Sequence, residues 1–406
     1  MRKNSLVVRE DAVKLANALT AANLSQYEIY PQRGFLPSFD PLDRLAREFD
    51  AWEDAAGELP KLLVTGRVRS LIDQLPVLDA NDLVENRGQR RAMVLLSFLG
   101  HAYAWGEKSM VDRLPACIAV PWHKVAGQLG RPPVLSYASY VLDNWRRIDP
   151  NGPIALGNIA LCQNFLGGLD EEWFILVHVA IEARASEALG AIVDAQRAVG
   201  DAKPKELEES LLIIASTLEK VHGILERMPE RCDPYIYYHR VRPYLHGWSN
   251  HPALPEGLIY DGVEAYGGQP QKFRGETGAQ SSLVPSLDAA LNITHKEDFL
   301  RAYLLEMRDY MPPAHRAFIE SIERGPSIRQ FVIENKTCSP SLRDAYNACV
   351  DWLERFRSVH LEYAKHYIQK QNKRGSRNPT DVGTGGTPFI PYLTKHRDET
   401  HKHLID

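Results

Sequence analysis

The sequence predicts an all-α protein, and three observations support this fold class. Apolar residues recur with the period of an α-helix along most of the 406 residues. Alternating β-branched stretches bounded by turns are scarce, with one short hairpin expected near residues 258–263. Hydrophobic residues make up 44% of the chain and charged residues 25%, which is typical of a globular protein. We therefore expect packed helices around a large buried core.

Helical periodicity predicts each element in chain order. The segment around residues 173–181 is apolar on all sides, which predicts a fully buried helix there. The last and longest segment carries an apolar stripe spaced by four and three residues, which predicts one buried face. The predicted helices cover residues 10–24, 42–56, 60–75, 90–105, 133–145, 171–196, 206–228, 284–293, 298–309, 313–323 and 341–369.

Clusters of helix-breaking residues predict the domain organisation. Asp149-Pro-Asn-Gly-Pro153, followed by Gly157 and Gly167-Gly168, separates two helical regions. We expect a small helical domain over 1–150, a linker over 151–172 and a large helical domain over 173–406. Glycine and proline are also dense in 249–282, which predicts a binding loop. The segment 383–387 is rich in glycine, which predicts either a flexible linker or a mobile lid.

Composition excludes several classes of function. The net charge is −4 without a basic block, so nucleic acid is not an expected partner. The longest apolar run, 173–181, is too short to span a membrane, and the N-terminus lacks the apolar region of a secretory signal. Five widely spaced cysteines without a C-x-x-C motif predict a reducing, cytoplasmic location. Hydrolase, zincin and nucleotide-binding motifs are absent.

His360 interrupts the apolar stripe of the segment 341–369. A core histidine that bonds a neighbour is one interpretation, and a metal or heme ligand is the other, because a buried neutral imidazole is a common nitrogen ligand. Arg357 precedes His360 by three residues, so its cation lies on nearly the same helix face and could meet a heme propionate.

Other residues suggest a ligand pocket. His178 lies in the apolar helix, and either pairs with Glu182 or faces a ligand. Arg242 lies five residues after Tyr237 at a predicted helix end before Pro243. It either forms a surface ion pair or binds a ligand with an aromatic ring and a carboxylate. The tail histidines His396, His401 and His403 are expected to be solvated, with metal chelation as the alternative.

Several motifs together resemble the indoleamine 2,3-dioxygenase family, all-α heme enzymes that open the pyrrole ring of tryptophan with dioxygen. Their order and spacing along most of the chain are more specific than any one motif. The motifs are Ala119-Val-Pro-Trp122, Pro132-Pro-Val-Leu-Ser-Tyr137 with Asn144-Trp145, Arg242-Pro-Tyr-Leu-His-Gly-Trp248, Gly278-Ala-Gln-Ser-Ser282, Tyr310-Met-Pro-Pro-Ala-His-Arg316, Arg357-Ser-Val-His360 and Gly383-Thr-Gly-Gly-Thr387.

The resemblance implies the roles of residues on the heme side. His360 matches the proximal iron ligand and therefore the metal-binding residue, and Arg357 matches the arginine near a propionate. Asp288 matches an acidic residue needed for heme retention. Thr277 and Gly278 match the loop over the heme.

The resemblance also implies how substrate is held. Arg242 matches the arginine that binds the substrate carboxylate, and Thr384 the threonine that meets its amino group. The matching pocket aromatics are Tyr137, Phe174 and Tyr237. His178 stands where mammalian members carry serine, but the related tryptophan 2,3-dioxygenases use a distal histidine to accept the indole N–H. Tyr140 stands where a small cysteine lines the pocket.

The resemblance implies a heme b dioxygenase that converts L-tryptophan to N-formylkynurenine in the kynurenine pathway. His178 and Arg242 would be its catalytic residues. Its partners would be L-tryptophan or a related indole, dioxygen and an electron donor that keeps the iron ferrous, and the protein would be a monomer. The alternatives are an enzyme for a modified indole and a non-enzymatic oxygen-binding heme protein on the same fold.

Overall fold

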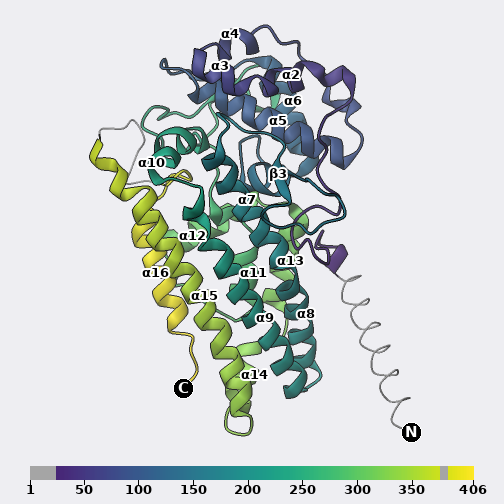
Figure 1. The fold of residues 1–406 in the computed structure, drawn as a ribbon, viewed down its shortest axis with the longest axis vertical. Coiled ribbons are helices and arrows are strands. Elements are labelled where there is room, and N and C mark those ends of the chain that lie inside the picture. The colour runs from purple at the N-terminus through teal and green to yellow at the C-terminus, as the bar shows by residue number, and fades with distance from the viewer. Residues whose placement is uncertain (1–23, 375–382) are drawn as a thin grey trace.

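The computed structural model describes residues 24–374 and 383–406, and the fold is all-α as predicted. The N-terminal helices form one end of the molecule, and long helices that run roughly parallel to its long axis form the other (Figure 1). The predicted helix over 10–24 lies, except for its last residue, outside the described residues.

The N-terminal end is built around α5, whose residues from 91 to 104 are buried. The predicted helices over 42–56, 60–75 and 90–105 are present, although 60–75 is covered by two short helices. The helix α6 was not predicted and contains Pro121 in its interior. The bounds are α2 Asp50–Gly57, α3 Leu59–Thr65, α4 Val68–Ile72, α5 Asn86–Trp105 and α6 Ala116–Leu129.

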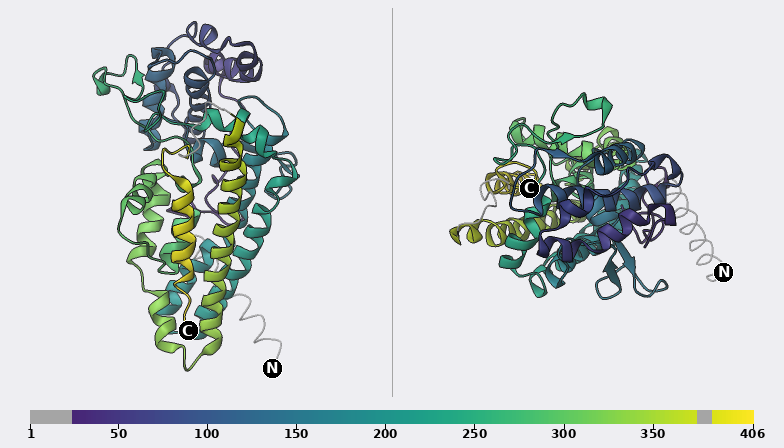
Figure 2. Two further views of the ribbon diagram at one scale, coloured as in Figure 1. Left: turned by 90° about the vertical axis from the view of Figure 1, so that its left-hand side faces the viewer. Right: turned by 90° about the horizontal axis from the view of Figure 1, so that it is seen from above.

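The C-terminal part is a bundle in which α9 packs along α8 and α15, and α16 lies beside α15 (Figure 2, left). The single predicted helix 171–196 is wrong, because it is two helices that meet at Ala185. The helices α14 and α16 were not predicted. The bounds are α7 Leu169–Arg184, α8 Ser186–Gly200, α9 Pro204–Leu225, α10 Pro234–Ile236, α11 Leu283–Ala290, α12 Phe299–Met307, α13 Pro313–Arg324, α14 Ile328–Asn335, α15 Pro340–Tyr367 and α16 Phe389–His401.

Two predicted elements are replaced by other structures. The segment 133–145 is not an α-helix. It contains a short π-helical turn, Ala138–Leu142. The predicted hairpin near 258–263 is also wrong. There β4 (Ile259–Tyr260) pairs in parallel with the distant β1 (Arg113–Leu114), because glycines mark where a strand ends but not which strand it pairs with. The strands β2 (Trp145–Arg147) and β3 (Ile159–Leu161) form an antiparallel pair.

Buried apolar residues form two clusters, one centred on α5 and α6 and one on α9 and α15. Phe174 on α7 packs against both clusters. Tyr137 belongs to the first cluster and Tyr237 to the second, and both side chains line the large cavity described below. The cavity therefore lies where the two cores meet, and the division into two domains and a linker stays a prediction.

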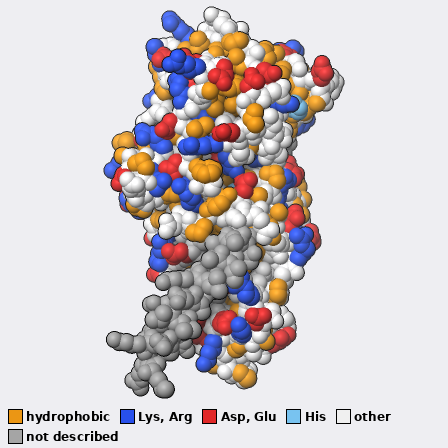
Figure 3. Space-filling view, turned by 90° about the vertical axis from the view of Figure 1, so that its right-hand side faces the viewer, with side chains coloured by type: hydrophobic (Ala, Val, Ile, Leu, Met, Phe, Trp, Pro, Cys, Tyr) orange, Lys and Arg blue, Asp and Glu red, His pale blue; other side chains and the backbone are white. Residues whose placement is uncertain are grey.

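The surface carries charges of both signs. On the face shown in Figure 3, acidic and basic side chains are interspersed with apolar ones over the described residues. None of the helices in the described part of the chain is long and apolar enough to cross a membrane.

Candidate active site

A cavity of about 640 Å³ lies between α7, α11, α12 and α15. This volume is within the range of about 300 to 1,000 Å³ found for pockets that bind small molecules and cofactors. Every candidate site residue from the sequence lines this one cavity. These residues are Tyr137, Phe174, His178, Tyr237, Arg242, Thr277, Gly278, Asp288, Arg357, His360 and Thr384.

His360 projects into the cavity from the C-terminal half of α15. The first half of this helix packs into the core through residues such as Cys349 and Leu353, and the same helix face then reaches the cavity wall at His360. The ring is open to the cavity but enclosed by protein on its other sides, and this desolvation, with a smaller contribution from the charge of Arg357, lowers the pKa of His360 to about 4. The ring is therefore neutral near pH 7 and has lone-pair nitrogen for a metal.

His178 lines the same cavity from α7, close enough to act electrostatically on His360. Its Nδ1 lies 2.7 Å from the carbonyl oxygen of Phe174, which can only accept, so Nδ1 carries the proton. Burial lowers the pKa of His178, although the bond to Phe174 opposes this. The neutral ring therefore leaves Nε2 as a hydrogen-bond acceptor.

Asp288 on α11 connects to α15 through Arg357. Its Oδ2 accepts hydrogen bonds from Arg357, at 2.7 Å, and from Nε2 of His295, at 3.3 Å. Burial alone would raise the pKa of Asp288, but the charges of Arg357 and His295 hold it well below its usual range. Arg357 also donates to the hydroxyl of Thr400 on α16. Asp288 is thus a permanent anion that joins α11 to α15, and through Arg357 to α16.

The expectation that all three tail histidines are solvated is wrong for His396. Its side chain is 5% exposed and stacks between Tyr392 and His295, because α16 folds back along α15. The ligand atoms of His295, His396 and Glu399 lie within 4.8 Å of one another, and His295 donates to Glu399 at 2.7 Å. This cluster extends the network of Asp288. The expectation is also wrong for His403, which is half-buried, accepts a hydrogen bond from the backbone N–H of Thr294 and donates to the carbonyl oxygen of Glu399. His401 is exposed, as expected.

The alternative in which His178 pairs with Glu182 is wrong. The Oε1 of Glu182 accepts instead from the hydroxyls of Tyr137, at 2.9 Å, and Ser281, at 2.7 Å. Burial raises the pKa of Glu182 to about 7, although both hydrogen bonds lower it. Tyr137 is thereby fixed in the cavity wall, and His178 is left to face the cavity.

Arg242 is fully buried beside two tyrosines. Its guanidinium lies 5.6 Å from the ring of Tyr238 and donates to Nε2 of His246 at 3.2 Å. Tyr237 opens a π-helical turn, Tyr237–Val241, and Tyr137 immediately precedes the other π-helical turn. Such turns are rare in proteins as a whole, but those that occur are often found at functional sites.

Two loops line the cavity, one at Thr277 and Gly278 and one at Gly383 and Thr384. Thr277 starts the turn Gly278–Gln280 and accepts a hydrogen bond from the backbone of Ala279. Thr384, in the predicted glycine loop, donates its hydroxyl to the carbonyl oxygen of Glu276. The loop itself is closed by a 2.7 Å hydrogen bond from Gly383 to Thr387. The two segments, more than a hundred residues apart in sequence, thus share one rim.

Comparison with known proteins identifies the family. The family described as "Indoleamine 2,3-dioxygenase" matches residues 23–403. Indoleamine 2,3-dioxygenase 1 of Rattus norvegicus is 40% identical over 94% of this chain and 96% of its own length. The chain belongs to the indoleamine 2,3-dioxygenase family. Indoleamine 2,3-dioxygenase of Saccharomyces cerevisiae is 35% identical over 93% of the chain and 92% of its own length, and 6-hydroxytryptophan 2,3-dioxygenase of Fusarium equiseti is 32% identical over 94% and 98%.

Members of the indoleamine 2,3-dioxygenase family are heme-dependent dioxygenases, so the chain is an oxidoreductase that acts on tryptophan or a related indole. The cavity fits heme. A neutral His360 faces it, its walls include the apolar side chains of Leu283 and Phe356, and the guanidinium groups of Arg301 and Arg357 suit the two carboxylates of the cofactor.

Sequence reasoning did not single out Glu276, and it named Glu182 only as a possible partner of His178. Glu182 and Glu276 are 1% and 5% exposed, although a glutamate is not expected inside a protein without a partner. The only sequence signal is the position of each, four residues after His178 and one before Thr277. Tyr140 is fully buried behind the cavity wall, with its ring 6.4 Å from that of Phe174.

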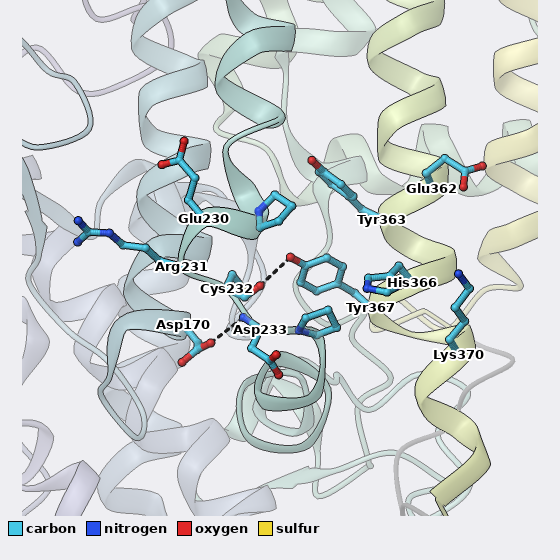
Figure 4. A pocket seen from close by; sticks show the side chains of 12 residues that line it. Asp170, Glu230, Arg231, Cys232, Asp233, Glu362, Tyr363, His366, Tyr367 and Lys370 are labelled. Atoms are coloured by element: carbon cyan, nitrogen blue, oxygen red, sulfur yellow. Dashed lines mark hydrogen bonds between the residues drawn. The ribbon is translucent and has the colours of Figure 1, made fainter.

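A second pocket of about 610 Å³ lies between the C-terminal end of α15 and residues 229–234 (Figure 4). Tyr363 and Tyr367 line both pockets, so these two rings form a shared wall. Tyr367 donates its hydroxyl to the carbonyl oxygen of Cys232 at 2.7 Å, which fixes that wall. The second pocket carries charged side chains of both signs and lies outside the candidate active site.

Proposed function

We propose that this enzyme oxidises L-tryptophan with dioxygen to N-formylkynurenine, cleaving the C2–C3 bond of the indole in the kynurenine pathway of tryptophan catabolism. One observation carries the proposal. A neutral His360, a neutral His178 with a free acceptor nitrogen and a buried Arg242 line the same cavity. These groups match an iron, an indole N–H and a carboxylate respectively.

On the cofactor side, His360 binds the iron of heme b, and Thr277 and Gly278 contact the heme from the loop. Asp288 and Arg357 hold the helix that carries His360, and Arg357 adds positive charge near a propionate. The bound heme supplies the binding and activation of dioxygen. The protein determines where the indole lies relative to it.

On the substrate side, Arg242 binds the carboxylate in a bidentate manner, and Thr384 meets the amino group. Tyr137, Phe174 and Tyr237 enclose the indole ring. His178 accepts the indole N–H at Nε2, since Nδ1 is committed to Phe174. Together they orient the ring and exclude water, which is how a fixed binding geometry accelerates the reaction.

The proposal is tested with the heme-loaded, reduced protein. Incubation with L-tryptophan and ¹⁸O₂ should give N-formylkynurenine that carries one ¹⁸O in its formyl group and one in its ketone, as measured by mass spectrometry. A reduced protein that binds heme but forms no labelled product from L-tryptophan contradicts the proposal.

A modified indole is the second candidate substrate. The 6-hydroxytryptophan 2,3-dioxygenase of Fusarium equiseti matches nearly the whole chain. The cavity also contains the phenol groups of Tyr137 and Tyr237, which could meet a ring hydroxyl. A higher kcat/KM for 6-hydroxytryptophan than for L-tryptophan would favour this candidate.

The reaction requires ferrous iron, and therefore a source of electrons. We infer an electron donor that keeps the iron ferrous and a monomeric enzyme. A cytoplasmic location stays a prediction of the sequence.

A further inference from the structure

Glu276 is a buried carboxyl group in the wall of the cavity. Its side chain is 5% exposed, and among the described residues none donates a hydrogen bond to its carboxylate, since desolvation alone shifts its pKa. Glu171 and Glu182 are similarly buried, but Glu171 accepts from three backbone N–H groups and Glu182 from two hydroxyls. Desolvation raises the pKa of Glu276 to about 8. A buried carboxyl without a partner is costly and requires an explanation.

The backbone holds Glu276 in place. A Cβ on the preceding Gly275 would lie 2.2 Å from the backbone nitrogen of Gly247, so the two chain segments touch in a way that only glycine allows. The N–H of Glu276 donates to the carbonyl oxygen of Leu245 at 3.0 Å, and its carbonyl oxygen accepts from the hydroxyl of Thr384. The carboxyl is therefore positioned on a fixed backbone at the rim.

Glu276 and Arg242 both act electrostatically on the phenol of Tyr237. Burial raises the pKa of the Tyr237 phenol, the negative charge of Glu276 raises it further, and the positive charge of Arg242 lowers it. The phenol thus lies within electrostatic range of both groups, and the cavity carries an acidic and a basic group around one aromatic ring. A zwitterionic amino acid carries the complementary pair of charges.

We propose that Glu276 forms a binding site for the α-ammonium group of the substrate, while Arg242 binds its carboxylate. This inference rests on the proposed function and names the charged group of the substrate that the acid recognises. The ammonium group supplies the hydrogen-bond donors that the protein does not. Its positive charge favours the ionised carboxylate, so Glu276 releases its proton as the substrate binds, and the resulting hydrogen bond between two charged groups is strong in a dry site. Thr384, which is bonded to the same residue, places a hydroxyl beside this site.

The test compares three ligands by the spectral shift of the heme in holoenzyme. L-Tryptophan carries both charged groups, indole-3-propionate lacks the ammonium, and tryptamine lacks the carboxylate. In Glu276→Gln, which removes the charge but keeps the shape, Kd should rise about 10- to 100-fold for L-tryptophan and tryptamine. The Kd for indole-3-propionate should stay within about twofold, because it has no group for Glu276 to bind.

Two variants provide the controls. Arg242→Gln should show the opposite pattern, with weaker binding of L-tryptophan and indole-3-propionate but not of tryptamine. Glu209→Gln, which removes an exposed carboxylate on α9, should leave all three Kd values unchanged. If Glu276→Gln does not fold, Glu276→Asp keeps the charge on a shorter chain and should weaken only the two ammonium ligands.

The possible failures are distinguishable. Equal losses of all three ligands, or no loss of any, would overturn the role of Glu276 alone. Loss of heme from Glu276→Gln would assign the carboxyl to the cofactor and also overturn it. A parent holoenzyme that binds none of the three ligands would overturn the proposed function, and the inference with it.

Discussion

Asp288 accepts a 2.7 Å hydrogen bond from Arg357, which lies three residues before His360 on α15. The pair joins the helix that carries the proposed iron ligand to α11. Both side chains are largely buried, at 14% and 9% exposure for Asp288 and Arg357. The ion pair therefore holds the helix segment that positions His360, the proposed iron ligand.

Breaking this pair should destabilise the heme site. In Asp288→Asn, Arg357 keeps its charge but loses its anion, which is expected to cost about 3 to 5 kcal/mol for a buried pair. We expect a lower thermal midpoint and a lower ratio of heme absorbance to protein absorbance. Asp351→Asn is the matched control, since it breaks an exposed pair with Arg355 on the same helix and should cost less than about 1 kcal/mol. Equal effects of both variants would contradict the role of the pair.

His360→Ala should lose most of the bound heme, because no other described histidine combines a cavity position with a place on the face of α15 beside Arg357. The measurement is the Soret absorbance of the purified protein. His366→Ala removes an exposed histidine from the same helix and should retain the heme. A His360→Ala protein with the full Soret absorbance of the parent would falsify the assignment.

Arg242→Ala should impair substrate binding while keeping heme. Truncating one partner of a buried charge pair costs about 2 to 5 kcal/mol, so kcat/KM for L-tryptophan should fall by at least about 30-fold. Arg240→Ala removes an exposed arginine two residues away and should leave the kinetics unchanged. Unaltered turnover by Arg242→Ala at limiting L-tryptophan would contradict its role.

Glu182 predicts a pH dependence of stability. Its pKa is about 7 in the folded protein and near 4.5 in the unfolded chain, so the folded state holds its proton more tightly. Stability from this group is therefore highest below pH 4.5 and is lost as pH rises towards 7. Glu182→Gln has no proton to lose.

The measurement compares Glu182→Gln with its parent at pH 5 and pH 8. The free energy of unfolding of the variant relative to the parent should improve by about 1 to 3 kcal/mol between these two pH values. Glu209→Gln, at an exposed position, should show no such change. A pH-independent difference for Glu182→Gln would show that the carboxyl is already ionised when folded.

Some elements could be predicted from sequence because their signal is local. The 3.6-residue period persists along α15, and the predicted range 341–369 differs from the observed helix by one or two residues at each end. The signal fails for α6, where Pro121 stands in the helix interior, a position that proline disfavours. It also fails between α7 and α8, where Ala185 gives no indication of a break. Packing against other helices determines both.

The candidate site shows the same limit. The residue types and spacing of Arg357 and His360 made a heme ligand one of two interpretations, and the family resemblance singled it out. Sequence could not show that Glu182 bonds Tyr137 rather than His178, because the partner comes from a distant part of the chain. Nor could it show that Glu276 is buried, since burial of a charge depends on the loop contacts around it.

His178 offers the most specific prediction about the indole. Its Nδ1 proton is committed to the carbonyl oxygen of Phe174, and burial favours the neutral ring, so Nε2 can accept the indole N–H. In His178→Ser, heme should be retained, and Kd for L-tryptophan should rise about tenfold, as expected for one lost hydrogen bond. 1-Methyltryptophan has no N–H to donate, so its Kd should hardly change. Spectral titration of both ligands measures this difference, and the exposed His401→Ser provides the control. If His178→Ser weakens both ligands equally, the histidine supports the cavity wall, and Tyr137, Phe174 and Tyr237 alone position the indole.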